Sequence, residues 1–214
     1  MTAELPQAPE GARRVFGGRL ARAEDFAAIL ADTGVSHGLI GPREVPILWE
    51  RHILNCAVIE DAFSRDARVV DVGSGAGLPG VAVAIARPDL DLHLVEPMLR
   101  RTQWLESTVA DLGLDNVTVH RGRAEELHGS LEGAYVTARA VARLDKLARW
   151  CLPLTAPGGT MVAMKGRSAQ EELEAATKVL RRLGVVASRV SAHGTEVLAE
   201  PTLTVDCTTG PRAH

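Results

Sequence analysis

The sequence predicts an α/β protein in which helices cover both faces of a mostly parallel seven-stranded sheet. Three observations predict this fold class. Apolar, β-branched segments alternate with segments of helical periodicity from residue 67 onward. A glycine-rich turn joins the first of these strands to the first of these helices. The last two strand-like segments leave no space for a helix between them, so we expect a C-terminal antiparallel hairpin.

A helical N-terminal extension, residues 1–66, is predicted to precede the sheet. Residues 1–18 are rich in Pro, Gly, Ala and Arg, which predicts a loose tail. Apolar residues at helical spacing then predict helices over 19–31 and 47–63. The extension is expected to pack beside one core domain, residues 67–214, because the chain is short for two full domains.

The core domain is expected to alternate strands with helices, which favours parallel pairing with right-handed crossovers. In chain order we predict strand 68–72, helix 80–87, strand 91–96, helix 99–112, strand 116–121, strand 134–139, helix 143–152, strand 159–164, helix 168–183, strand 185–191 and strand 196–206. His193 and Gly194 are expected to form the turn of the terminal hairpin.

The turn after the first predicted strand carries the most informative motif. Asp71 ends the strand, and four glycines follow it: Gly73, Gly75, Gly77 and Gly80. Glycine permits positive φ and leaves no Cβ between the backbone and a ligand. A strand, a glycine-rich turn and a helix together are typical of a nucleotide pocket in an α/β fold, although such turns also occur without a ligand.

Two nucleotides fit this turn. The last three glycines match G-x-G-x-x-G, the dinucleotide fingerprint. Asp71 and the first three glycines match D-x-G-x-G-x-G, which resembles motif I of the S-adenosylmethionine (SAM) methyltransferases. A carboxylate at the strand end would repel the pyrophosphate of a dinucleotide, whereas SAM carries cationic groups and no phosphate. SAM is therefore the favoured ligand, contacted by Asp71, Gly73, Gly75 and Gly77.

Two later segments add candidate cofactor residues. Glu96 ends the second predicted strand, where an acidic side chain can accept hydrogen bonds from both ribose hydroxyls; the alternative is a solvated carboxylate. Ala124 and Glu125 follow the third predicted strand. In methyltransferases the loop at this place lies beside the adenine, so both residues are candidates for contacting the base.

Composition excludes several classes of protein. Hydrophobic residues make up 46% and charged residues 24% of the chain, which is ordinary for a globular protein. No apolar run is long enough for a membrane helix, and we expect a cytoplasmic monomer. The 3 cysteines and 7 histidines form no metal-ligand cluster, so no metal is expected. The net charge of −3 means that any nucleic-acid contact must come from local basic patches.

Several stretches together resemble one family, the small-subunit ribosomal RNA methyltransferase G family, formerly called glucose-inhibited division protein B. These are Arg-His-Ile-Leu-Asn-Cys at 51–56, the glycine turn at 70–80 with its unusual Leu-Pro-Gly end, and the segments 100–105, 122–126, 137–142 and 164–166. The resemblance implies a Rossmann-like SAM-dependent methyltransferase fold. It also implies methyl transfer to N7 of one guanine in the decoding-region loop of 16S rRNA, on naked RNA or within an assembling 30S subunit.

The resemblance also assigns residues. It implies cofactor contacts at Gly73, Leu78, Ala124, Glu125 and Arg139, and S-adenosylhomocysteine as the product. The chain departs from the family pattern in its N-terminal region. Asn55 and Cys56 stand where the family usually has Asp and Ser, and residues 37–40 replace the usual Asn-Leu-Thr segment.

Arg139 and Lys165 are the candidate catalytic residues. Guanine N7 already has a free lone pair, so the protein has to orient the reactants and needs no general base. Arg139 ends the fourth predicted strand, where it could hold the SAM carboxylate, bind guanine O6, or form an exposed ion pair. Lys165 ends the fifth predicted strand, where it could either bind a phosphate or be a solvated lysine. His52 is expected to be half-buried with a structural partner.

Other functions remain open from the residues alone. The nearest is a SAM-dependent methyltransferase of another RNA or of a small metabolite. An NAD(P)-dependent oxidoreductase is disfavoured by Asp71 and by the terminal hairpin. A module that keeps the fold without the reaction is also compatible with the sequence. The arginines at 13, 14, 19 and 22 could form an RNA-binding arm.

Overall fold

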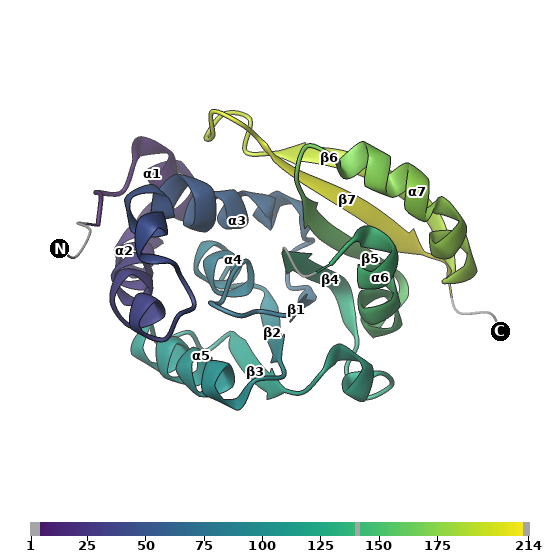
Figure 1. Ribbon diagram of the computed structural model, residues 1–214, viewed down its shortest axis with the longest axis horizontal. Coiled ribbons are helices and arrows are strands. Elements are labelled where there is room, and N and C mark those ends of the chain that lie inside the picture. Colours follow the sequence, from purple (N-terminus) through teal and green to yellow (C-terminus); the bar gives the residue numbers. More distant parts are fainter. Residues whose placement is uncertain (1–4, 140–141, 212–214) are drawn as a thin grey trace.

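The computed structural model describes residues 5–139 and 142–211 of the protein (Figure 1). Its sheet has seven strands in the order β3-β2-β1-β4-β5-β7-β6. The pairs among β1 to β5 are parallel, and β7 pairs antiparallel with both β5 and β6. The mostly parallel sheet with an antiparallel C-terminal pair is therefore confirmed.

The strands begin and end close to the predicted positions, apart from the last one and from the fifth, which begins four residues before the predicted start at 159. They are β1 Arg68–Val72, β2 Asp91–Glu96, β3 Val117–Arg121, β4 Gly133–Arg139, β5 Thr155–Lys165, β6 Val185–His193 and β7 Thr202–Thr209. Because β1, β2, β4 and β5 run parallel, their carboxyl ends meet at one edge of the sheet, where ligands bind in open α/β folds.

Helices cover both faces of the sheet, as Figure 1 shows. One face packs against α4 (Gly80–Ala86) and α5 (Leu99–Asp111), and the other against α6 (Leu144–Cys151) and α7 (Ala169–Arg182). The two apolar clusters divide along each strand: Val69 belongs to the first and Val70 to the second. This alternation follows from the two-residue period of side chains in a strand.

The N-terminal extension packs into the same apolar cluster as α4 and α5. It contains α1 (Glu10–Phe16), α2 (Leu20–Ile29), α3 (Asn55–Ala57) and the 3₁₀- or π-helical segments Gly17–Arg19, Leu30–Gly34, Pro42–Ile47, Trp49–Leu54 and Val58–Ala62. The prediction of a loose tail is wrong for residues 10–16. Ala12 and Phe16, four positions apart on one face of α1, are both fully buried, and this burial orders the helix.

The hairpin connection also differs from the prediction. β7 begins at Thr202, not at residue 196, so the connection spans residues 194–201. The backbone amides of Val197 and Leu198 donate hydrogen bonds to the Gly194 carbonyl, which forms a loop. Their side chains pack against the apolar cluster that the N-terminal extension shares with α4 and α5. Their apolar character, which predicted a strand, is explained by this packing.

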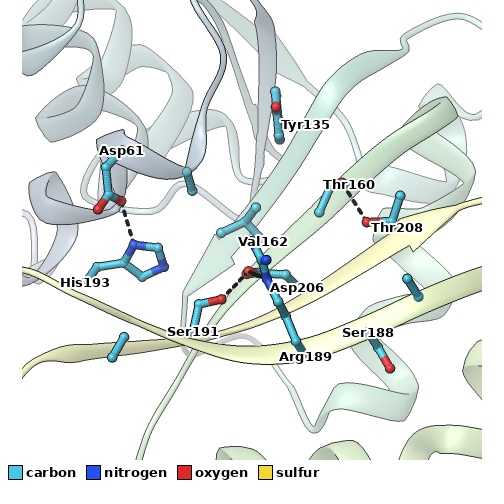
Figure 2. Close-up of a pocket in the computed structure, with 13 residues that line it drawn as sticks. Asp61, Tyr135, Thr160, Val162, Ser188, Arg189, Ser191, His193, Asp206 and Thr208 are labelled. Atoms are coloured by element: carbon cyan, nitrogen blue, oxygen red, sulfur yellow. Dashed lines mark hydrogen bonds and ion pairs between the residues drawn. The ribbon is translucent and has the colours of Figure 1, made fainter.

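A polar hollow of about 490 Å³ lies over β4 to β7, and the helical segment Val58–Ala62 forms part of its wall (Figure 2). Its side chains bind one another. His193 contacts Asp61 of the N-terminal extension, and Asp206 accepts hydrogen bonds from Arg189 and Ser191. The hollow therefore links the N-terminal extension to β6 and β7 through paired groups.

Among the residues that the structure describes, no helix combines the length and apolar character needed to cross a membrane. Within the same residues, no group of three or more His, Cys, Asp or Glu side chains lies close enough to hold a metal ion.

Candidate active site

The glycine turn connects β1 to α4 in a conformation that requires glycine. Gly73, Gly75 and Gly77 have φ values of 76°, 53° and 76°. A Cβ at Gly77 would also lie 2.6 Å from Val81 Cγ2. Side chains other than glycine rarely adopt these angles, so the turn depends on its sequence directly.

Asp71 lies beneath this turn. Its side chain is fully buried, and its Oδ2 accepts a hydrogen bond from the Gly80 amide at 3.0 Å. Its Oδ1 has no hydrogen-bond partner among the described residues. Burial raises the pKa of Asp71 to about 6, against the opposing effect of its hydrogen bonds. Asp71 thus anchors the start of α4 and does not line the neighbouring cavity.

A cavity of about 390 Å³, the cofactor pocket, opens at the carboxyl ends of β1, β2 and β4. Its lining residues are Val72, Gly73, Val95, Glu96, Pro97, Met98, Arg101, Gly122, Arg123, Ala124, Glu125, Arg139 and Trp150. Five of the predicted cofactor residues line it: Gly73, Glu96, Ala124, Glu125 and Arg139. The other four, Asp71, Gly75, Gly77 and Leu78, are not among its lining residues. Leu78 is only 3% exposed and belongs to the apolar core.

Glu96 fastens the glycine turn to the end of β2. Its Oε2 accepts a hydrogen bond from the Gly75 amide at 3.1 Å, and its Oε1 accepts one from the Met98 amide at 3.0 Å. The residue is 3% exposed, which excludes the solvated carboxylate. Each carboxylate oxygen carries a second lone pair, so Glu96 can accept further hydrogen bonds from a ligand.

A larger cavity of about 820 Å³, the basic pocket, adjoins the cofactor pocket. Its lining residues are Glu44, Arg51, His52, Asn55, Arg139, Ala142, Arg143, Met164, Lys165, Gly166 and Glu172. Arg139 lines both cavities. It does not lie in an exposed ion pair; its Nη1 donates to Nδ1 of His52 at 3.2 Å. Ala140 and Val141, within the family-like segment 137–142, lie outside the described residues.

Lys165 is held by the protein itself. Its Nζ donates to the Ala142 carbonyl and to Glu172 Oε2, both at 2.8 Å, and its side chain is 8% exposed. Burial acts to raise the pKa of Glu172, but the hydrogen bonds from Lys165 and from the Leu144 amide outweigh it and lower that pKa. The lysine is therefore neither solvated nor free to bind a phosphate in this conformation.

His52 and Glu44 are site residues that the sequence analysis did not assign. His52 Nε2 and Glu44 Oε2 are 2.7 Å apart, and the His52 side chain is 13% exposed. Burial lowers the pKa of His52, while the hydrogen bond from His52 to Glu44 opposes this effect. The one signal in the sequence was the position of His52 within the family-like stretch 51–56.

Comparison with known proteins identifies the family. The family model described as rRNA small subunit methyltransferase G matches residues 19–200. The chain belongs to this family. The family's Streptomyces avermitilis member, named ribosomal RNA small subunit methyltransferase G, is 55% identical over 204 residues, which cover 95% of this chain and 85% of the relative. The protein of the same name from Paenarthrobacter aurescens is 55% identical over 196 residues, covering 92% and 91%.

Solved structures show the same fold at low sequence identity. The S-adenosylmethionine-dependent methyltransferase SibL gives a TM-score of 0.63 at 18% identity, over 89% of this chain and 70% of that chain. A SAM-dependent O-methyltransferase from Thermotoga maritima gives 0.55 at 16% identity, over 75% and 66%. The Rossmann-like methyltransferase fold predicted for this member of the methyltransferase G family is therefore confirmed.

The departures from the usual pattern of the methyltransferase G family are accommodated by local contacts. Asn55 Nδ2 donates to Thr202 Oγ1, and that hydroxyl donates back to the Asn55 carbonyl, both at 2.8 Å. Cys56 is fully buried, and burial raises the pKa of its thiol to about 12. Arg19, considered as part of an RNA-binding arm, instead donates to the carbonyls of Ile85 and Ala86 at the end of α4.

Proposed function

We propose that this chain transfers the methyl group of SAM to N7 of a guanine in the decoding-region loop of 16S rRNA, releasing S-adenosylhomocysteine. The observation that carries the proposal is the position of Arg139. It forms part of the wall of both the cofactor pocket and the basic pocket. A donor and an acceptor bound in two cavities that share one residue would meet beside its guanidinium.

The residues of the cofactor pocket fit SAM. Glu96 offers a buried carboxylate to the ribose hydroxyls, and the short helical segment Ala124–Leu127 brings Ala124 and Glu125 to the place of the base. Gly73 has no side chain, so its backbone is accessible to a ligand in the cofactor pocket. Asp71 supports the turn from below, and Leu78 supports it from the core. A carboxylate on the ribose suits SAM and a dinucleotide alike. The preference for SAM therefore depends on the family and on the antiparallel β7, and no longer on charge repulsion by Asp71.

The basic pocket fits a nucleotide of the RNA. Arg51 and Arg143 line it, and both are exposed. Its two carboxylates, Glu44 and Glu172, are already bound to His52 and Lys165. Phosphate oxygens would therefore meet cations at the rim and few unpaired anions, which favours binding of nucleic acid.

We assign to the protein the role of orienting the SAM methyl group and guanine N7 relative to each other. SAM supplies an electrophilic methyl group when bound, and guanine N7 has a free lone pair. An arginine side chain can donate hydrogen bonds to both O6 and N7 of a guanine. Because N7 must keep its lone pair free to react, we assign the hydrogen bond of Arg139 to O6. Holding the two reactants in line lowers the barrier without a proton transfer.

Methyl transfer from radiolabelled SAM tests the proposal. We expect incorporation into 16S rRNA, either naked or within 30S subunits, at one guanine, and loss of that modification in cells that lack the protein. Label appearing only in another RNA or in a small metabolite would favour the alternative acceptor. Calorimetry that detects NAD binding and no SAM binding would contradict the cofactor assignment. With 16S rRNA as the substrate, we also propose a cytoplasmic location for the protein.

A further inference from the structure

Arg139 is held from the N-terminal extension by a chain of two contacts. Its Nη1 lies 3.2 Å from His52 Nδ1, and His52 Nε2 lies 2.7 Å from Glu44 Oε2. The three residues come from β4, from the helical segment Trp49–Leu54 and from the segment Pro42–Ile47. All three line the basic pocket.

The contacts determine the protonation of the imidazole. An arginine guanidinium has only donors, so His52 Nδ1 must be the acceptor in its contact with Arg139. The other ring nitrogen then carries the proton and donates it to Glu44 Oε2. Only the neutral imidazole protonated at Nε2 satisfies both partners.

The surroundings of His52 favour this neutral form. Arg51 on its own helical segment and Arg139 on β4 both oppose a positive charge on the ring, and Glu44 is the one carboxylate that directly binds it among the described residues. Across the pocket stand Arg143 and the paired Lys165 and Glu172. Burial of the ring has the largest effect on the pKa of His52, and together with the two arginines it lowers that pKa from its ordinary value, against the opposing effect of Glu44.

We propose that neutral His52, oriented by Glu44, is a positioning residue that holds the Arg139 guanidinium at the junction of the cofactor pocket and the basic pocket. This inference rests on the proposed methyl transfer. When His52 takes up a second proton, both ring nitrogens become donors and the contact with Arg139 is replaced by repulsion. Glu44 keeps its hydrogen bond in either state, so the change falls on Arg139.

Substitutions separate this role from a structural one. His52→Asn retains an acceptor near the position of Nδ1 and cannot gain the proton, whereas His52→Leu removes the acceptor. We expect His52→Leu to lower kcat by about 10- to 100-fold, the range expected for a misplaced orienting group, with a smaller change in KM for RNA. We expect the wild type to show an acid limb in its pH profile below pH 6.5, because the pKa of His52 is lowered from that value. His52→Asn should retain more of the rate and lose this acid limb.

Glu44→Gln tests the second contact. The carboxylate of Glu44 raises the pKa of His52, so its loss should move the acid limb to lower pH and also lower kcat. His37→Asn is the matched control, because His37 contacts Ser36 and Thr33 and lies outside both pockets. Its rate and pH profile should equal those of the wild type. Unchanged kcat and pH profile in folded His52→Leu would overturn the proposal.

A spectroscopic measurement decides the question without activity. In heteronuclear NMR of the free protein at neutral pH, the ring nitrogens of His52, assigned by comparison with His52→Asn, should show a proton on Nε2 and none on Nδ1. Arg139→Ala should then raise the pKa of His52, because a nearby cation is removed. A proton on Nδ1 contradicts the inference. A wild-type protein with this NMR pattern but no methyl transfer to 16S rRNA would contradict the proposed function alone.

Discussion

Gly80 packs closely against Leu94 and Asp71 beneath the glycine turn. A Cβ at position 80 would collide with Leu94 and lie 2.7 Å from Asp71 Oδ2. We expect Gly80→Ala to lower the free energy of unfolding by about 1–3 kcal/mol, the usual cost of overpacking a core. Urea denaturation measures the effect. Gly18→Ala is the control, because nothing lies within 4 Å of its Cβ position, and an equal loss in both variants would contradict this reason.

Glu96 combines a structural role with a proposed ligand role. Glu96→Gln keeps an acceptor oxygen but loses the charge that strengthens its hydrogen bonds. We expect affinity for SAM, measured by calorimetry, to fall about tenfold or more, since a hydrogen bond to a charged group contributes about 1.5–3 kcal/mol. Glu125→Gln, at an exposed position of the same pocket, should have a smaller effect. Equal losses would argue against direct recognition by Glu96.

Lys165 and Glu172 join β5 to α7, and Glu172 also accepts from the Leu144 amide at the start of α6. Removing one partner by Lys165→Met leaves a partly buried carboxylate without its cation. We expect a loss of about 1–3 kcal/mol in the free energy of unfolding. Lys165→Met with Glu172→Gln should recover part of it, because no uncompensated charge remains. A double variant less stable by the sum of both losses would contradict the pairing.

This pair also makes stability depend on pH. The pKa of Glu172 is lower in the folded protein than its ordinary value of 4.5. The stabilisation is therefore complete above pH 4.5 and is lost as the pH falls through the lower, folded pKa. In acid titrations followed by circular dichroism, Glu172→Gln should flatten this dependence. An unchanged acid transition would show that the carboxylate is not linked to folding.

The elements could be predicted from the sequence where local pattern determines them. Strands 68–72 and 91–96 match β1 and β2 because each is a short segment rich in apolar residues that a turn residue, glycine or proline, follows directly. The start of β7 could not be predicted, since Val197 and Leu198 pack on a distant part of the chain. The prediction of a loose N-terminal tail was wrong for the same reason. The burial of Phe16 depends on contacts with residues far away in the sequence, which the local pattern does not contain.

The candidate site shows the same division. The glycine turn, Glu96 and the segment after β3 could be located from motif and spacing. The contact between His52 and Arg139 joins two residues that are 87 positions apart, one in the N-terminal extension and one in β4. The periodicity of apolar residues along the sequence does not predict such a contact. The ion pair of Lys165 was also missed, because a lysine at a strand end looks the same in sequence whether it is free or bound.

On the scale of the whole molecule, the local distribution of charge bears on RNA binding more than the net charge does. The net charge is −3, yet Arg51, Arg139 and Arg143 surround one cavity. We expect Arg143→Ala to weaken binding of 16S rRNA and to reduce the slope of log affinity against log salt by about 1, the value for one lost phosphate contact. Arg182→Ala, at the end of α7, is the control and should leave the slope unchanged; a reduced slope there would contradict a localised interface.

The link between the N-terminal extension and β7 has a consequence for synthesis of the protein. Asn55, next to the segment that carries His52, is bound to Thr202, and Asp61 is bound to His193. These partners lie 147 and 132 positions further along the chain. A growing polypeptide can therefore fasten this wall of the basic pocket only after β7 has left the exit tunnel, and a product of premature termination before Thr202 would leave the wall unfastened.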